Sequence, residues 1–289
     1  MRNWKIAGFV ATLVIGLSMP LYLARVHFLG KPSATLVPER LAGFVGSEKC
    51  KSCHKREYDL WKDSHHDRAM EVASDETVLG DFNDVTLEHH GVVSRFYRQD
   101  SKFYVHTPGP GGEMGDFEVT HTFGWYPLQQ YLVPFPGGRY QCLPIAWDMN
   151  RKRWYHLYPA PPIAPDDWLH WTNAGQNWNG MCAECHSTNL KKNYDVDIDS
   201  YETTWSDIDV GCEACHGPGS RHVEWAELPD MARPPVKNVE LVVQTSGLTS
   251  RSLVELCAPC HSRRVALGDS THAEPDLLDS MLPQKLNEG

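Results

Sequence analysis

The chain has 289 residues, with 27 lysines and arginines against 37 aspartates and glutamates, so its formal net charge is −10 at pH 7. A chain this acidic lacks the basic face that phosphate binding requires, which argues against a nucleic-acid-binding function. Protein partners are instead expected to present basic surfaces. The length fits one large or two modest domains.

The N-terminus is the first predicted element. Arg2 and Lys5 precede an uncharged run over residues 6–24. This run is close to the roughly 20 residues that a membrane-spanning helix needs, and longer than the apolar region of a typical cleaved signal. We therefore predict a signal anchor over residues 1–25, with a cleaved signal peptide as the alternative. Both place the remainder of the chain outside the cytoplasm, after a linker over residues 26–45.

The chemistry of the chain lies in its cysteines. Eight of the nine cysteines form Cys-x-x-Cys pairs, and each pair is followed directly by a histidine. The motifs are Cys50/Cys53/His54, Cys182/Cys185/His186, Cys212/Cys215/His216 and Cys257/Cys260/His261.

Two thiols three positions apart lie on one side of a helical turn, where both can add to the vinyl groups of one porphyrin. The histidine that follows can then ligate the iron. Paired Cys-x-x-Cys motifs also bind zinc, but zinc does not require a histidine after every second cysteine. The motifs therefore predict four covalently bound haem c groups, with the motif histidines as proximal ligands.

The regions between the motifs differ in character. Residues 84–157 contain no motif and are rich in aromatic and β-branched residues around a Gly-Pro-Gly-Gly turn, which predicts a β-rich insertion of hairpins. A helix is expected from Lys55 to about Val72, and short helices with irregular chain beyond residue 175. The predicted fold class is a multihaem cytochrome c over residues 46–289, made mostly of short α-helices and irregular chain wrapped around four haems. It carries the β-rich insertion and an N-terminal transmembrane helix.

Haems with two histidine ligands would need four further histidines. Helical phase places His65 on one face with Tyr58 and Trp61, and Ser220 is a plausible N-cap that would put His222 in a first helical turn. His156 and His170 lie in aromatic surroundings before the second motif. The insertion contributes His89, His90, His106 and His121.

Four runs of sequence carry a family resemblance. They are CKSCHKREYDLWKDSHHDRAM, TFGWYPLQQYLVPFPGGRYQ, LHWTNAGQNWNGMCAECHSTNLKKNYD and CEACHGPGSRHVEWA. They resemble the multihaem cytochromes c that carry C-terminal tetratricopeptide repeats, within a wider group that includes the nitrifier tetrahaem cytochrome c. The resemblance covers roughly residues 45–289 and implies an exported electron-transfer protein with closely stacked haems.

The same resemblance bears on the distal ligands. Within the motif W-x-x-S-x-H it points to His66 rather than His65, against the helical phase, and it supports His222. His170, His156, His65 and His121 remain further distal candidates. Similar proteins usually continue past the fourth motif with more haems and helical repeats, which are absent up to Gly289, so the fourth haem's second ligand stays open.

We expect an electron carrier that relays electrons on the outer side of the cytoplasmic membrane, held there by its N-terminal helix. Its partners would be a redox donor and acceptor, including other haem proteins of a membrane complex. One alternative is an enzyme acting on a small nitrogen or sulfur compound at a five-coordinate haem. Another is a membrane-anchored quinol dehydrogenase or wire subunit. Arg221, Arg263 and Arg264 follow motifs closely and are candidate partners of haem propionates.

The first testable prediction concerns cofactor load. Since all the motifs are complete, the intact mass of mature protein should exceed that of the polypeptide by four haems, and haem staining should survive denaturation. Fewer than four haems in protein from a host competent for haem attachment would contradict this interpretation.

Overall fold

The computed structural model describes residues 19, 41–160, 162–267 and 277–284. The chain divides into two compact units, residues 1–41 and 42–289. No helix within the described ranges is long and apolar enough to cross a membrane. The predicted anchor over residues 1–25 lies, apart from Met19, outside those ranges.

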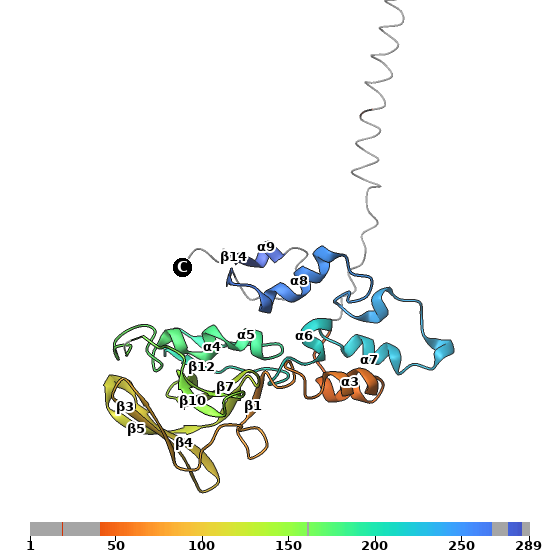
Figure 1. The fold of residues 1–289 in the computed structure, drawn as a ribbon. Coiled ribbons are helices and arrows are strands. Elements are labelled where there is room, and N and C mark those ends of the chain that lie inside the picture. Colours follow the sequence, from red (N-terminus) through yellow and green to blue (C-terminus); the bar gives the residue numbers. More distant parts are fainter. Residues whose placement is uncertain (1–18, 20–40, 161, 268–276, 285–289) are drawn as a thin grey trace, which may run out of the picture. The chain divides into compact units, whose positions relative to one another are not determined.

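Short helices carry the motifs (Figure 1). The α-helices are α2 (Ser47–Lys51), α3 (Lys55–Trp61), α4 (Trp178–Met181), α5 (Ala183–His186), α6 (Cys212–His216), α7 (Ser220–Ala226), α8 (Ser250–His261) and α9 (Leu277–Ser280). Short 3-10 helices are η2 (Pro110–Gly112), η3 (Ala174–Gln176), η4 (Asp230–Ala232) and η5 (Lys237–Glu240).

The predicted β-rich region forms two antiparallel sheets. The first has the order β2-β3-β4-β5, from β2 (Val85–His89), β3 (Val92–Gln99), β4 (Lys102–Pro108) and β5 (Met114–Val119). The second has the order β1-β6-β7-β9-β10, with β8 also paired to β7. Its strands are β1 (Met70–Val72), β6 (His121–Phe123), β7 (Leu128–Phe135), β8 (Arg139–Cys142), β9 (Ile145–Asp148) and β10 (Arg153–His156). Two short pairs complete the strands: β11 (Tyr194–Asp195) with β12 (Ser200–Tyr201), and β13 (Arg264–Ala266) with β14 (Met281–Pro283).

The main hydrophobic core lies between these two sheets. Alternate residues of β4 are buried, as expected for a strand with one face against a core. The buried cluster joins Phe96 of the first sheet to Trp154 of the second, whose rings stack with centroids 3.8 Å apart. Phe82 sits at its centre and contacts four other aromatic rings. The insertion therefore has a core that needs no cofactor.

A second, smaller core connects the insertion to the second motif. Met70, Leu132, Cys142, Trp178 and Ala183 are buried together, and Cys182 packs against them. Cys142, the cysteine outside the motifs, is thus a buried apolar residue. Through this cluster the insertion packs directly against a haem-attachment helix.

The chain around the third and fourth motifs has little core of its own. From residue 189 to the end of the described chain, the buried apolar side chains of any size are Pro259 and Met281. Many large apolar side chains there are exposed instead: Leu228, Met231, Val239, Val242, Leu253, Val254, Val265, Leu267, Leu278 and Leu282. So much exposed apolar surface indicates that something else covers it.

Two local predictions were wrong in detail. The helix expected from Lys55 to about Val72 ends at Trp61, because Lys62 is extended and Asp63 adopts a positive φ of 63°. Residues 70–72 instead form β1, paired with β6. Ser220 is the first residue of α7 rather than its N-cap, and its hydroxyl accepts from the backbone of Gly43 at 2.9 Å.

The second prediction tests the independent core. Phe82→Ala should destabilise the insertion by about 3–5 kcal/mol, because it removes a buried ring that four others contact. The exposed Val93 of β3 provides a matched control, and Val93→Ala should change stability by less than about 0.5 kcal/mol. Chemical denaturation followed by tryptophan fluorescence measures both variants. Equal stability of the two would show that this cluster is not the core.

Candidate functional site

Each motif begins or ends a short helix. In the second, third and fourth motifs the histidine is the last helical residue, at the ends of α5, α6 and α8. In the first motif α2 ends just after Cys50, and the amide of His54 donates to the carbonyl of Cys50 at 2.9 Å. The two cysteines of each motif are therefore separated by one turn, as attachment to one porphyrin requires.

The first motif differs from the prediction at its second cysteine. Because α2 ends at Lys51, Cys53 lies in a turn outside the helix, whereas the sequence predicted both thiols on one helical turn. The amide of Cys53 still donates to the carbonyl of Cys50 at 3.2 Å, which preserves the spacing of a turn. Cys53 is also exposed, and its sulfur lies 3.8 Å from Ser52 Oγ. An exposed thiol is open to a porphyrin vinyl group, so haem attachment at Cys53 stays a prediction and only its helical setting is corrected.

The first and third motifs contact each other through their leading cysteines. The thiols of Cys50 and Cys212 shift each other's pKa, lowering that of Cys212 to about 7 and raising that of Cys50, while the thiol of Cys50 donates to the carbonyl of Gly46 at 3.8 Å. A lower pKa favours the thiolate, the reactive form of cysteine. The close approach depends on Gly211, where a Cβ would lie 2.4 Å from both Ser47 Oγ and Asp207 Oδ2.

Two carboxylates, one of them buried, hold this junction together. Glu213, inside the third motif and only 2% exposed, accepts backbone hydrogen bonds from Val45, Gly46 and Gly219 at 2.7–3.0 Å. Asp207 accepts from both the amide and the hydroxyl of Ser47. The hydroxyl of Ser47 in turn accepts from the amide of Cys212 at 3.0 Å. The chain that enters the first motif is thereby fastened to the third.

The second and fourth motifs also meet through cysteines. The thiol of Cys185 donates to the carbonyl of Pro259, inside the fourth motif, at 3.9 Å, and the nearby thiol of Cys260 lowers the pKa of Cys185 to about 7 while its own pKa is raised. Arg264 crosses the same junction, since its Nη2 donates to Sγ of Cys185 at 3.7 Å while its Nε donates to the carbonyl of Pro259 at 2.6 Å. Cys257 of the fourth motif contributes, after burial, to the raised pKa of Cys215 in the third.

Two histidines outside the motifs face motif histidines. The ring centroids of His54 and His222 lie 5.9 Å apart, with an interplanar angle of 30°. Those of His66 and His261 lie 6.1 Å apart at 68°. Partial burial lowers the pKa of His66, with His261 and His65 as nearby charges. The structure thus brings each of these two distal candidates to a motif other than the one it follows most closely in sequence.

Three histidines, two in motifs and one distal candidate, have their Nδ1 atom held by a neighbouring oxygen. Nδ1 of His186 lies 3.1 Å from the carbonyl of Ala69, and Nδ1 of His222 lies 2.8 Å from that of Val239. Nδ1 of His216 lies 3.2 Å from Thr245 Oγ1. A histidine held in this way presents its other nitrogen to a metal.

The remaining candidates lie in other surroundings. His65 has its ring against Trp125 and Tyr126. His156 stacks on His89 at 4.1 Å, within the insertion. Nδ1 of His170 lies 2.8 Å from Thr172 Oγ1. These contacts do not join the three candidates to a motif histidine.

His121 lies nearer to the second motif. It is 8% exposed, and burial lowers its pKa to about 4, so its imidazole is neutral at neutral pH. Its ring contacts Tyr140 at 5.0 Å, and Tyr140 packs in the same cluster as Cys182. Two residues further along β6, the ring of Phe123 lies 4.2 Å from that of His186.

The residues present fit covalently bound haem. Cysteine pairs with a following histidine are the donor set of haem c, and the apolar side chains exposed around the third and fourth motifs would pack against porphyrin. In the sequence, Arg68 lies between His66 and Ala69, whose carbonyl holds His186. Its Nε is buried and has no hydrogen-bond partner in the described structure. A carboxylate of a bound group would satisfy that donor.

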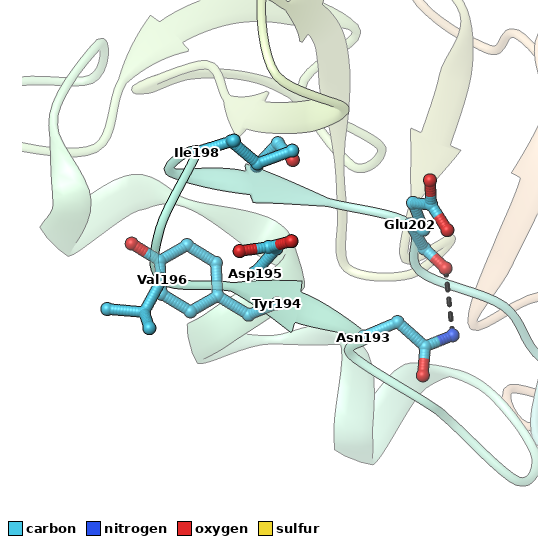
Figure 2. A pocket seen from close by; sticks show the side chains of 7 residues that line it. Asn193, Tyr194, Asp195, Val196, Ile198 and Glu202 are labelled. Carbon is cyan, nitrogen blue, oxygen red and sulfur yellow. Dashed lines mark hydrogen bonds between the residues drawn. The ribbon is translucent and has the colours of Figure 1, made fainter.

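A separate pocket of about 430 Å³ lies on the β11–β12 hairpin (Figure 2). Tyr194, Val196 and Ile198 line it, and Asn193 donates to the carbonyl of Glu202 beside it. It contains no motif residue, so it is not the site described above.

The sequence did not single out Glu213, which fastens the first motif to the third. Glu213 occupies a variable position of its motif, and its only signal is an acidic side chain between Gly211 and Gly217. The pairing of cysteines from different motifs carries no local signal at all.

Comparisons with known proteins lead to multihaem cytochromes. The family described as cytochrome c554 and c-prime matches residues 49–115 and 170–217, which include the first three motifs and less than half of the chain. No curated protein matches the chain. The motifs and this match support a multihaem c-type cytochrome.

Two solved structures are similar. The outer cell wall cytochrome OcwA matches with a TM-score of 0.53 and 16% identity, over 83% of this chain and 45% of that one. An undecahaem cytochrome from the S-layer of Carboxydothermus ferrireducens matches with a TM-score of 0.41 and 19% identity, over 81% of this chain and 30% of that one. The chain therefore spans less than half the length of either protein. The first likeness supports a multihaem cytochrome fold.

The third prediction tests the buried carboxylate. Glu213→Gln should destabilise the junction of the first and third motifs by about 1–3 kcal/mol, because an amide keeps one acceptor oxygen and loses the charge. Backbone amides of Val45 and Gly46 should then exchange hydrogen about tenfold faster or more, measured by mass spectrometry on the haem-loaded protein. The exposed Glu202 supplies the control, Glu202→Gln, for which no change is expected. Unaltered exchange at residues 43–46 in Glu213→Gln would contradict the role.

Proposed function

We propose that this protein is an electron-transfer cytochrome that carries four covalently bound haems and relays electrons outside the cytoplasm. The observation that carries the proposal is the close approach of complete attachment motifs, the first to the third and the second to the fourth. The amide of Cys212 in the third motif donates to the hydroxyl of Ser47, just before the first motif, at 3.0 Å. Sγ of Cys185 in the second motif lies 3.9 Å from the carbonyl of Pro259, inside the fourth. Groups bound at these cysteines would lie close together, as electron transfer through the protein requires.

The chain's own residues have distinct roles in this proposal. Haem c supplies a one-electron iron couple where it is bound. The eight motif cysteines hold it by thioether bonds, and His54, His186, His216 and His261 are proximal ligands. Ala69 and Thr245 hold the Nδ1 atoms of His186 and His216, which leaves each Nε2 directed to the iron.

Two distal ligands are proposed from the ring distances. Imidazoles bound on opposite sides of one metal, each at about 2 Å, have centroids on the order of 6 Å apart. His222 and His54 meet this condition at 5.9 Å, and His66 and His261 at 6.1 Å. His222 would thus complete the first haem and His66 the fourth, which supplies the second ligand that the resemblance left open.

His121 is our candidate for the second motif. Burial keeps its imidazole neutral, which is the form that binds metals. Strand β6 also carries Phe123, whose ring packs on His186. His170, buried in the described chain just before η3, remains a further distal candidate that we assign to no particular motif.

Location and partners follow from chemistry and charge. Haem is attached to this motif on the outer side of the membrane, so we propose an extracytoplasmic site, with residues 1–25 as the anchor. The net charge of −10 becomes more negative with the haem propionates, which favours redox donors and acceptors with basic docking surfaces.

The fourth prediction tests the proposed distal ligands. His66→Ala and His222→Ala should each convert one of four low-spin haems to a high-spin form that binds carbon monoxide, while the other three remain unchanged. Optical and electron paramagnetic resonance spectra measure the change. His65→Ala and His90→Ala are the controls, since their rings face Trp125 and His89 instead. If His66→Ala leaves every haem low-spin, His65 or a histidine of the insertion is the ligand.

A further inference from the structure

Arg264 is a largely buried cation placed between two attachment motifs. Its side chain is 11% exposed, although it lies only three residues after His261. Besides the bond to Pro259 inside the fourth motif, its Nη2 donates to Sγ of Cys185 in the second motif at 3.7 Å. Arg263, next to it, is exposed. Two adjacent arginines thus occupy different environments.

An acidic group faces Arg264 at this junction. Oε1 of Glu184, between the two cysteines of the second motif, lies 3.4 Å from Arg264 Nη2, and its side chain is 28% exposed. The fixed charges around the sulfur of Cys185 therefore include a guanidinium and a carboxylate. Removing the charge of Arg264 makes the surroundings of this sulfur more negative, and removing the charge of Glu184 makes them more positive. In each case the remaining group loses its counter-charge.

We propose that Arg264 and Glu184 set the reduction potential of the haem attached through Cys185, with Arg264 raising the potential and Glu184 lowering it. This inference rests on the proposed function, since it requires haem at the second motif. Reduction adds one electron from a redox partner to the iron and makes the site more negative by one charge. A cation beside the thioether sulfur stabilises the reduced form, and a carboxylate disfavours it.

The position of Arg264 gives this effect a direction. Because Arg264 donates both to the carbonyl of Pro259 in the fourth motif and to Sγ of Cys185 in the second, the charge pair lies where the second and fourth attachment sites meet. A higher reduction potential at the second-motif haem would make that haem the one more often reduced. Arg264 is thus a tuning residue for electron transfer between these two sites, in addition to bridging them.

The experiment compares four single variants of the haem-loaded protein by spectroelectrochemical titration. Arg264→Gln should lower the midpoint potential of one or two of the four haems, and Glu184→Gln should raise it. Each change should be on the order of tenfold in the ratio of reduced to oxidised haem, about 59 mV for a one-electron couple. Arg263→Gln should leave all potentials in place, and Arg264→Lys, which keeps the charge, should largely retain the wild-type potential.

The outcomes separate a tuning role from a structural one. Intact mass establishes that each variant carries four haems, and a variant with fewer haems bears on the proposed function instead. If Arg264→Gln and Glu184→Gln shift the potentials in the same direction, or if Arg264→Lys behaves like Arg264→Gln, the pair acts only as a structural bridge. Potentials unaltered in both glutamine variants, with four haems present, would also overturn the inference.

Discussion

The buried carboxylate of Glu213 is the interaction on which the arrangement of motifs depends. It accepts from the backbone on both sides of the junction, at Val45 and Gly46 before the first motif and at Gly219 after the third. A buried charge is tolerated only when such bonds satisfy it, so breaking them is costly. More than 160 residues separate Val45 from Glu213 in sequence, and this contact brings the first and third attachment sites together.

Buried hydrophobic residues are distributed unevenly between the insertion and the chain around the motifs. The insertion has a packed core between its two sheets, whereas the chain around the third and fourth motifs exposes side chains such as Leu253 and Val254. Such a segment buries too little surface to offset the entropy of ordering it. Cofactor attachment there would supply the missing apolar contacts and would couple folding to haem binding in this part of the chain, whereas the insertion has a packed core of its own residues.

The sequence predicted the motifs and the β-rich region because both are local signals. The strands between β2 and β10 lie within residues 85–156, close to the expected 84–157. The helical-phase argument for His65 assumed a helix that continues past residue 65. That assumption was wrong, since α3 ends at Trp61 and Asp63 turns the chain. Which histidine meets which motif could not be read from spacing, because His222 faces His54 across a long stretch of chain. Such pairings arise from tertiary contacts, as do the roles of Glu213 and Arg264.

Charge acts on two scales in this protein. The overall charge of −10 gives a negative field that would disfavour reduction of any bound haem iron and would favour partners with basic surfaces, as proposed above. Solvent and salt screen that field, so exposed charges differ little in their effect on any one site. A buried guanidinium against Cys185 is screened far less. One side chain can therefore distinguish neighbouring attachment sites that the overall charge treats alike, which is what directional electron transfer among chemically identical cofactors requires.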